Sequence, residues 1–166
     1  MTETTDAPTT GKRRATFNTL EVSELRRLTE DSVEVTFAVP EELADDYDYV
    51  PGQYVALRKE LDGAEVRRSY SICAVPKRGE IRVAVKKDIG GKFSTWANES
   101  LEVGERIDVM NPQGAFTSRT HVTSLNDAQK VAAEKVAEKK DTHLVAFAAG
   151  SGITPIMAIA KACLLY

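Results

Sequence analysis

Several short segments of the chain alternate apolar with polar residues, and turn signals separate these segments. The alternation is clearest at residues 33–39 and 81–85. A period of two is that of a β-strand with one buried face. Pro51-Gly52, Asp62-Gly63 and Arg78-Gly79 have the residue types of tight turns. This pattern limits the fold to antiparallel β-structure more strongly than any other feature of the sequence.

Six strands and one short helix are predicted in this part of the chain. The short spacing of the strands favours a mainly β fold, a six-stranded antiparallel Greek-key barrel, over a layered α/β domain. A type I turn is expected at Asn111-Pro112-Gln113-Gly114. The strands are expected around Leu20–Val22, Val33–Val39, Gln53–Arg58, Arg67–Ile72, Ile81–Lys87 and Arg106–Met110, with the helix at Phe93–Leu101.

The predicted organisation has four parts. Residues 1–16 are a polar tail expected to be disordered, residues 17–118 form the barrel, and residues 119–142 form a charged linker helix. Residues 143–166 begin an α/β domain, because the apolar run LVAFAA is typical of a parallel strand and GSGITP leads from it into a helix. The second strand of such a domain would lie past Tyr166, so the chain is expected to be the N-terminal part of a longer protein.

Charge and composition exclude several function classes. The formal net charge is −3 and the pI is about 5.5, so neither nucleic acid nor an anionic membrane is the expected partner. No apolar run approaches the roughly 20 residues of a membrane-spanning helix, and the N-terminus lacks a signal peptide, which favours a cytoplasmic protein. Cys73 and Cys163 are far apart and do not form a metal-binding motif, so they are expected to be reduced, buried thiols.

The segment RRSYSI, residues 67–72, places two arginines beside an aromatic ring inside a strand. Alternation puts Arg68 and Tyr70 on one face, and Arg67, Ser69 and Ser71 on the other. A guanidinium next to an aromatic ring can bind a phosphate while the ring stacks on a flat ligand. Taken alone, the same residues favour the simpler interpretation, an exposed arginine and a tyrosine that closes the barrel.

Two glycine-containing segments are candidate phosphate sites. In GGKFST, Gly91, Lys92, Phe93 and Ser94 enter a helix whose first N–H groups can bind a pyrophosphate. In GSGITP, residues 150–155, the glycines allow a tight turn, with Thr154 as helix cap and Pro155 at the first helical position. Each segment by itself is also consistent with an ordinary turn before a helix.

Taken in order, VPGQY, RRSYS, VKK, GGKFS, NPQGAF and AAGSGITP resemble the ferredoxin-NADP reductase family. The resemblance covers nearly all of residues 17–166. Within the family, RRSYSICAVP and GGKFSTWANESLEVGERIDVM look most like the reductase subunits of phenylacetyl-CoA epoxidases, which implies a role in phenylacetate degradation.

The resemblance implies an oxidoreductase that takes electrons from NAD(P)H through FAD to an iron–sulfur carrier or oxygenase component. It implies that Arg68 pairs with the FAD pyrophosphate, Tyr70 stacks on the isoalloxazine and Ser71 bonds near flavin N5. Tyr70, Ser71 and Thr154 are the residues expected at the reacting groups. The resemblance implies that cofactors are bound by Arg68, Ser69, Tyr70, Ser71, Val85, Lys87, Gly91, Lys92, Phe93, Ser94, Gly150, Gly152 and Thr154.

The sequence departs from the family in its cysteines, and it also allows a rival interpretation. The phenylacetyl-CoA epoxidase reductases imply a cluster held by four cysteines, whereas this chain has two, so no iron–sulfur cluster is expected here. The rival interpretation is a cofactor-free barrel that binds oligonucleotides, with basic residues and stacking rings along one surface. That surface would contain Arg67, Arg68, Lys86 and Lys87 with Tyr70 and Phe93.

Overall fold

A computed structural model describes residues 14–116 and 150–165 of the chain. These residues include the whole predicted barrel up to residue 116 and the helix at the C-terminal end. The predicted linker helix at 119–142 and the predicted strand at 144–149 lie outside the described residues, as does most of the predicted tail.

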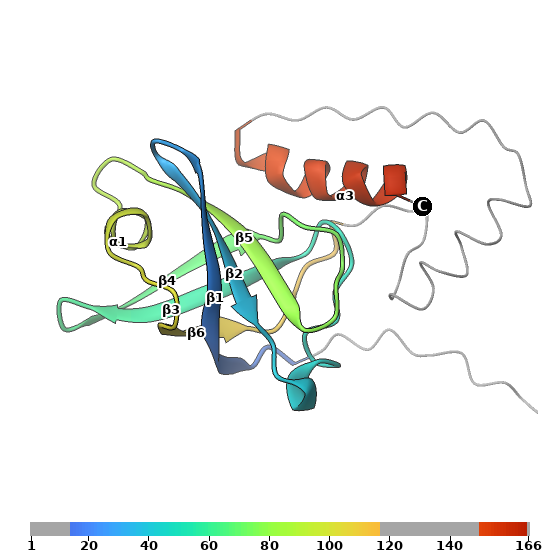
Figure 1. Ribbon diagram of the computed structural model, residues 1–166, viewed down its shortest axis with the longest axis horizontal. Coiled ribbons are helices and arrows are strands. Elements are labelled where there is room, and N and C mark those ends of the chain that lie inside the picture. The colour runs from blue at the N-terminus through green and yellow to red at the C-terminus, as the bar shows by residue number, and fades with distance from the viewer. Residues whose placement is uncertain (1–13, 117–149, 166) are drawn as a thin grey trace, which may run out of the picture.

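Within the described residues, the six predicted strands form one antiparallel sheet (Figure 1). The order across the sheet is β4-β3-β6-β1-β2-β5, so β6 lies between β1 and β3 and the chain follows a Greek-key path. The mainly β fold and the strand set predicted from the sequence are therefore confirmed. The strands are β1 (Phe17–Thr29), β2 (Ser32–Ala38), β3 (Tyr54–Leu61), β4 (Ala64–Ser71), β5 (Glu80–Lys86) and β6 (Arg106–Met110).

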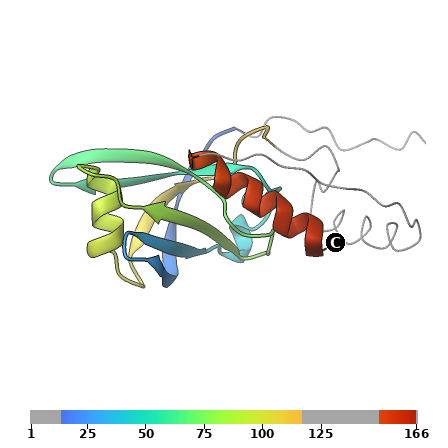
Figure 2. The ribbon, with the colours of Figure 1, turned by 90° about the horizontal axis from the view of Figure 1, so that it is seen from above.

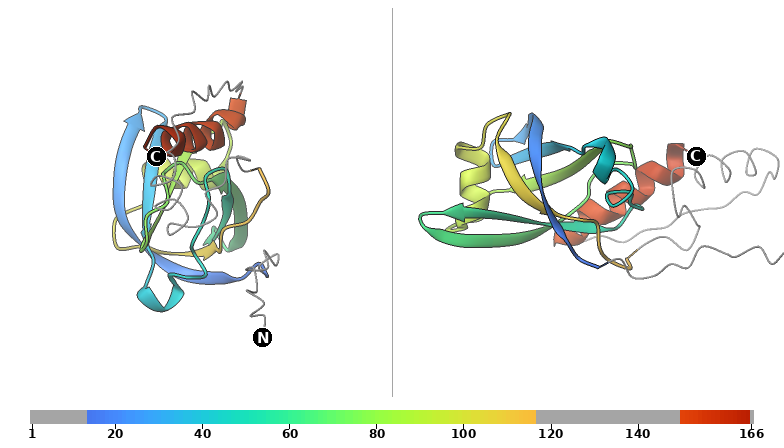
Figure 3. Two further views of the ribbon diagram at one scale, coloured as in Figure 1. Left: turned by 90° about the vertical axis from the view of Figure 1, so that its right-hand side faces the viewer. Right: turned by 90° about the horizontal axis from the view of Figure 1, so that it is seen from below.

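The sheet curls until its two edge strands meet. Directly after β4, Ile72 forms an antiparallel bridge with Val83 of β5. The N–H of Cys73 donates to the carbonyl oxygen of Arg82 over 3.0 Å. The two views of Figure 3 show the strands curving around a common interior. Closure gives the unpaired edges of β4 and β5 a partner near this point, which limits edge exposure.

The interior is filled by the alternating residues that predicted the strands. Val33, Val35 and Phe37 of β2 are at most 3% exposed, and Val83 and Val85 of β5 are fully buried. These side chains belong to one apolar cluster that includes residues from every strand. Their burial is the main stabilising contribution to the barrel.

Tight turns occur at the predicted glycine positions. Asp62 and Gly63 both have positive φ, 53° and 72°, as a two-residue hairpin between β3 and β4 requires. Gly52 has φ 102°, and a Cβ there would collide with the carbonyl oxygen of Phe116. The predicted type I turn at residues 111–114 is wrong. Gln113 is extended instead, because its backbone pairs with Tyr54 through two hydrogen bonds of 2.9 Å.

Two short 3₁₀ segments and two α-helices complete the described structure. The 3₁₀ segments are η1 (Glu41–Leu43) and η2 (Gly150–Gly152), and the helices are α1 (Lys92–Glu99) and α3 (Ile153–Leu165). Helix α3 begins two residues before Pro155, so Thr154 lies inside its first turn and does not precede the helix as predicted. Proline is tolerated there because the first-turn N–H groups have no intrahelical partner. No helix among the described residues is long and apolar enough to span a membrane.

Helix α3 lies against the barrel (Figures 1 and 2). A Cβ at Gly52, in the turn before β3, would come within 3.3 Å of Ile159 Cδ1. Ala158 and Ala162 are 0% and 6% exposed. Small buried residues on one side of α3 allow this close approach.

Candidate functional site

Arg68 and Tyr70 share the inner face of the β3–β4 hairpin. Arg68 is the cross-strand partner of Leu57, and Tyr70 is the partner of Val55. Directly opposed residues in an antiparallel pair project from the same face. Leu57 and Val55 are buried in the core, at 1% and 0% exposure. Tyr70 therefore packs against the core while Arg68 remains exposed at the sheet edge.

Arg67 lies on the outer face, as the alternation predicts. Its guanidinium carbon is 4.9 Å from the centre of the Phe17 ring, and the Arg58 guanidinium carbon lies 4.4 Å from the same ring. One Arg67 nitrogen also contacts Met110 Sδ at 3.4 Å. These cation–π contacts tie Arg67 to β1 and β6, away from Tyr70.

The Tyr70 ring joins β4 to helix α1. Its centre is 5.8 Å from that of Phe93, and Phe93 meets Trp96 edge-on at 5.4 Å. Burial raises the pKa of the Tyr70 hydroxyl to about 12, with Asp88 adding to the rise and Arg68 opposing it. The hydroxyl therefore stays protonated at neutral pH and can donate a hydrogen bond.

Arg68 carries a charge that no described acidic side chain pairs with. Among residues 14–116 and 150–165, none of the ion pairs includes Arg68. Its hydrogen bond runs from Nη1 to the carbonyl oxygen of Arg67, over 2.7 Å. A planar guanidinium next to a half-buried ring can receive a ligand's anionic group.

The loop before α1 is folded tightly around Gly91. Ser94 Oγ accepts a hydrogen bond from the N–H of Asp88 at 3.0 Å and donates one to the carbonyl oxygen of Gly91 at 3.2 Å. A Cβ on Gly91 would lie 2.5 Å from Ser94 Oγ, so only glycine fits without moving the hydroxyl. Ser94 is 4% exposed. Its hydroxyl therefore holds the loop, and the backbone is the part that can meet a ligand.

The N-terminus of α1 has free donors. Gly91 precedes the helix and supplies no side-chain cap, and the first turn contains no acidic residue. The N–H groups of the first helical residues, Lys92, Phe93 and Ser94, lack intrahelical acceptors by helix geometry. These donors and the helix dipole favour an anion at this end.

Three of the predicted cofactor-binding residues have side chains that are buried in the core or paired with a carboxylate. The Val85 side chain is fully buried in the barrel core, so it does not line a surface. Lys87 Nζ is 2.6 Å from Glu99 Oε1, at the opposite end of α1 from Gly91. Lys92 Nζ is 3.7 Å from Asp62 Oδ2, at the tip of the β3–β4 hairpin. The Val85 side chain therefore lies in the core against which Tyr70 packs, and the Lys87 and Lys92 ammonium groups are each paired with a carboxylate.

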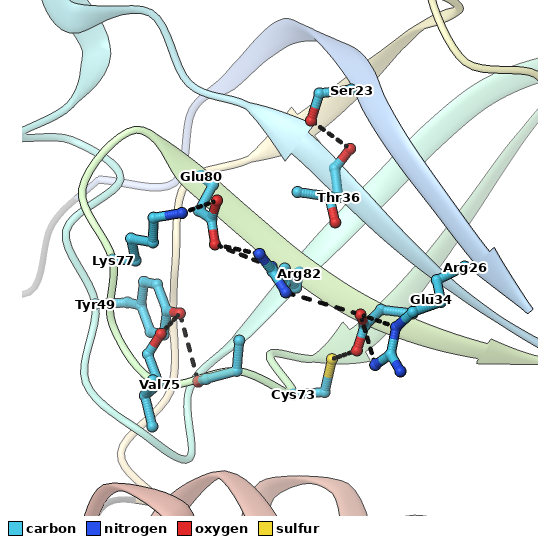
Figure 4. A network of polar contacts seen from close by, with 11 residues as sticks. Ser23, Arg26, Glu34, Thr36, Tyr49, Cys73, Val75, Lys77, Glu80 and Arg82 are labelled. Atoms are coloured by element: carbon cyan, nitrogen blue, oxygen red, sulfur yellow. Dashed lines mark hydrogen bonds and ion pairs between the residues drawn. The ribbon is translucent and has the colours of Figure 1, made fainter. Parts of the chain in front are cut away.

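Ser69 and Ser71 follow the outer-face alternation of β4, and Ser71 lies opposite Tyr54. The chain after Ser71 is held by side chains from two other segments, the loop before β3 and strand β2 (Figure 4). Tyr49 Oη donates to the carbonyl oxygen of Val75 over 2.9 Å, and Cys73 Sγ is 3.6 Å from Glu34 Oε2. These contacts fix the point at which β4 ends.

Glu34 anchors this polar network from β2. The residue is 8% exposed, and its Oε1 accepts two hydrogen bonds from Arg26, from Nε at 3.1 Å and from Nη2 at 3.0 Å. A buried carboxylate needs such partners. Burial chiefly raises the pKa of the Cys73 thiol to about 12, and the Glu34 carboxylate adds to the rise.

Gly150, Gly152 and Thr154 form a second candidate group at the start of α3. Gly150 has φ 54°, which favours glycine, and Gly150 and Gly152 belong to η2. A Cβ at either glycine would meet no atom within 4 Å. Within the described part of the chain, no neighbouring atom therefore blocks a ligand at this turn.

Sequence reasoning missed three residues that shape the site. Asp88 contributes to the raised pKa of Tyr70, and its backbone anchors Ser94. Asn98 and Arg27 hold the far end of α1. The available signal was Asn98 itself, because asparagine is a poor residue for a helix interior unless its side chain is hydrogen-bonded.

The arrangement suits a ligand with a flat ring and a phosphate. Tyr70 supplies aromatic surface and packs on the buried Phe93, and Arg68 and the start of α1 supply groups for an anion. Among the described residues, no group of three or more potential metal ligands is present. The donor set therefore fits a dinucleotide such as FAD and offers no metal centre of its own.

The family model for the oxidoreductase FAD-binding domain matches residues 19–118. The chain belongs to this family of FAD-binding oxidoreductase domains. The match confirms the class of protein indicated by the resemblance to ferredoxin-NADP reductases, and it covers the barrel and the site on β4 and α1.

Curated relatives and solved structures agree with this assignment. The chain is 42% identical over 144 residues to a subunit of the 1,2-phenylacetyl-CoA epoxidase of Escherichia coli K12. It is 33% identical over 147 residues to the ferredoxin reductase component of the Rhodococcus rhodochrous 3-ketosteroid-9-alpha-monooxygenase. In each case the match covers 87% of this chain and 36% of the relative. The chain thus spans about a third of the length of these relatives.

The fold is also that of the Amycolatopsis cytochrome P450 reductase GcoB. The TM-score is 0.65 at 24% identity, and the superposition covers 96% of this chain and 43% of that one. At this level of identity the likeness concerns the fold.

Proposed function

We propose that the barrel binds FAD on the surface formed by Arg68, Tyr70 and the N-terminus of α1. The observation that carries this proposal is the register of β4. It puts a guanidinium that has no acidic partner among the described residues on one face with a half-buried ring beside α1. A chain of the FAD-binding oxidoreductase family with this donor set is best explained as a flavin-binding domain.

Each side chain has a separate task in the proposed site. The Arg68 guanidinium neutralises the pyrophosphate, together with the backbone N–H groups that begin α1. The Tyr70 ring supports the isoalloxazine, and Phe93 holds Tyr70 in place from behind. Ser71 is the last residue of β4, where the alternation of the strand ends and the chain bends to the bridge at Ile72, and its hydroxyl is proposed to hydrogen-bond near the reacting edge of the ring. Bound FAD supplies the chemistry of accepting a hydride and releasing electrons.

The start of α3 is the proposed approach for NAD(P)H. No described atom lies within 4 Å of a Cβ built at Gly150 or Gly152, and Thr154 in the first turn offers a hydroxyl. A helix N-terminus favours the phosphates of a dinucleotide. The proposal is supported by the sequence resemblance and by the position of the glycines before a helix.

The protein is proposed to be a reductase component that delivers electrons to an iron–sulfur carrier or an oxygenase. The relatives named above are subunits or components of an epoxidase and a monooxygenase. The 42% identity to the phenylacetyl-CoA epoxidase subunit supports a role in phenylacetate degradation.

The oligonucleotide-binding alternative is not favoured, because most of its basic residues have partners. Arg67 packs on Phe17, Lys86 Nζ is 3.5 Å from Asp31 Oδ2, and Lys87 is paired with Glu99. The FAD-binding family match counts against this alternative independently.

Reconstitution tests the proposal. The purified chain is incubated with FAD and separated from free cofactor by gel filtration. The protein fraction is then examined for the flavin absorption band at about 450 nm. We expect the band to elute with the protein. A chain that elutes folded but colourless contradicts the proposed function.

A further inference from the structure

Asn98, near the end of α1, is a buried polar residue whose side chain is fully hydrogen-bonded. Its Nδ2 donates to the carbonyl oxygens of Ser94 at 2.9 Å and Val85 at 3.1 Å. Its Oδ1 accepts from Arg27 Nη1 at 2.9 Å. Asparagine has low helix propensity, and its burial at 7% exposure is costly without such partners. These bonds therefore explain its place in the helix.

Arg27, on β1, binds the backbone of the same residue. Its Nη2 donates to the Asn98 carbonyl oxygen over 2.6 Å. The last carbonyl groups of a helix have no intrahelical partner, and a cation near them complements the helix dipole. Arg27 is absent from the ion pairs among the described residues. Its guanidinium is therefore committed to holding the C-terminal end of α1.

The orientation of α1 depends on such contacts. The helix has eight residues, too few to be stable alone in water. Phe93 and Ala97 anchor α1 to the core through apolar contacts. Apolar contacts are not directional, so they fix the orientation of the helix less well than hydrogen bonds do. The clamp, defined as Arg27 with Asn98, adds three hydrogen bonds between the C-terminal end of α1 and strands β1 and β5, and a fourth within α1.

We propose that Arg27 and Asn98 are positioning residues for the phosphates of the cofactor. They hold α1 from its C-terminal end, so that the N–H groups at its start point in a fixed direction before the cofactor binds. This inference rests on the proposed function of the same site. Because neither residue lies at the start of α1, the clamp acts on the phosphates through the helix.

The test compares three flavins that differ in phosphate content. Riboflavin has none, FMN has one and FAD has two, so a defect in phosphate binding separates them. Dissociation constants are measured by flavin fluorescence for the unaltered chain and for Arg27→Met. Arg26→Met is the matched control, because it removes the neighbouring guanidinium, which pairs with Glu34 of β2 and not with α1.

For Arg27→Met we expect FMN and FAD to bind roughly tenfold more weakly, a loss typical of outer contacts that orient ligands. Riboflavin affinity should change less than about twofold, and Arg26→Met should leave the FAD-to-riboflavin affinity ratio unchanged. Arg27→Lys keeps the charge but cannot make both bonds to Asn98. Its FAD affinity should therefore lie between that of the unaltered chain and that of Arg27→Met. If Arg27→Met does not fold, Arg27→Lys decides the question.

Equal losses for riboflavin and FAD would show that the clamp has only a general structural role, and no loss for any flavin would overturn the inference as well. A chain that in its unaltered form binds none of the three flavins overturns the proposed function itself, and this inference with it.

Discussion

Arg68 and Tyr70 illustrate how one register decides the role of neighbouring residues. Arg67 and Arg68 are adjacent and chemically identical, yet one stacks on Phe17 and the other has no described acidic partner. The buried cross-strand partners Leu57 and Val55 show that Arg68 and Tyr70 lie on the inner face of the sheet. The alternation of β4 was predictable from the sequence, whereas the ring that occupies Arg67 was not, because Phe17 lies 50 positions away in the chain.

Arg68→Ala should weaken FAD binding by roughly 10- to 100-fold, the loss expected for a charge-assisted bond to phosphate. Arg67→Ala should change FAD affinity by less than about threefold, since its guanidinium lies on the other face. Both constants can be measured by fluorescence titration. Equal losses in the two variants would contradict the assignment of Arg68 to the site.

Cys73 should be a poor nucleophile at neutral pH. Burial and the Glu34 carboxylate raise its pKa to about 12, so the thiolate is scarce below that pH. In a Cys163→Ser background, alkylation by iodoacetamide at pH 8 should be at least about 100-fold slower than for a free thiol with an ordinary pKa. The rate should still be rising at pH 9.5. A plateau reached near pH 9 would show that the pKa of the thiol is not raised as described.

At the scale of elements, α1 was the hardest part to interpret from sequence. Its position after GGKFS was predictable, and it begins one residue earlier than expected. The clamp by Arg27 was not predictable, because β1 and α1 are about 70 residues apart and no periodicity links them. Likewise, Gln113 was assigned to a turn because local residue types favour one, but pairing with Tyr54 overrides that preference.

Gly91→Ala should destabilise the loop before α1. The added Cβ would lie 2.5 Å from Ser94 Oγ, so the hydroxyl must rotate and lose its bonds to Asp88 and Gly91. We expect a loss of roughly 1–2 kcal/mol in the free energy of unfolding, measured by urea denaturation. Gly152→Ala is the control, because a Cβ there meets nothing within 4 Å. Equal stability of the two variants would contradict the described loop.

At the scale of the whole molecule, the barrel brings together segments that no single motif connects. Closure of β4 on β5 places RRSYSI beside the helix that follows β5, so that Tyr70 meets Phe93. The order of RRSYS, GGKFS and GSGITP along the chain is by itself enough to indicate a flavin reductase. The burial of the Val85 side chain and the pairing of Lys87 with Glu99 depend on three-dimensional packing, which no local pattern in the sequence indicates.

FAD should stabilise the folded chain by an amount set by the ratio of its free concentration to its dissociation constant. At a free concentration 100 times the dissociation constant, a ligand specific for the native state adds about 2.7 kcal/mol. For a chain of this size that corresponds to a rise in Tm of roughly 5–10 °C. Thermal unfolding followed by circular dichroism measures the shift, with adenosine as the control ligand. An equal rise with adenosine would mean that the flavin end contributes nothing.

The most direct test of the account is a crystal structure of the chain with bound FAD. We predict that the isoalloxazine lies against Tyr70 and that the pyrophosphate lies between Arg68 and the N-terminus of α1. Flavin bound elsewhere on the barrel, with Arg68 and the start of α1 both facing solvent, would contradict the central claim.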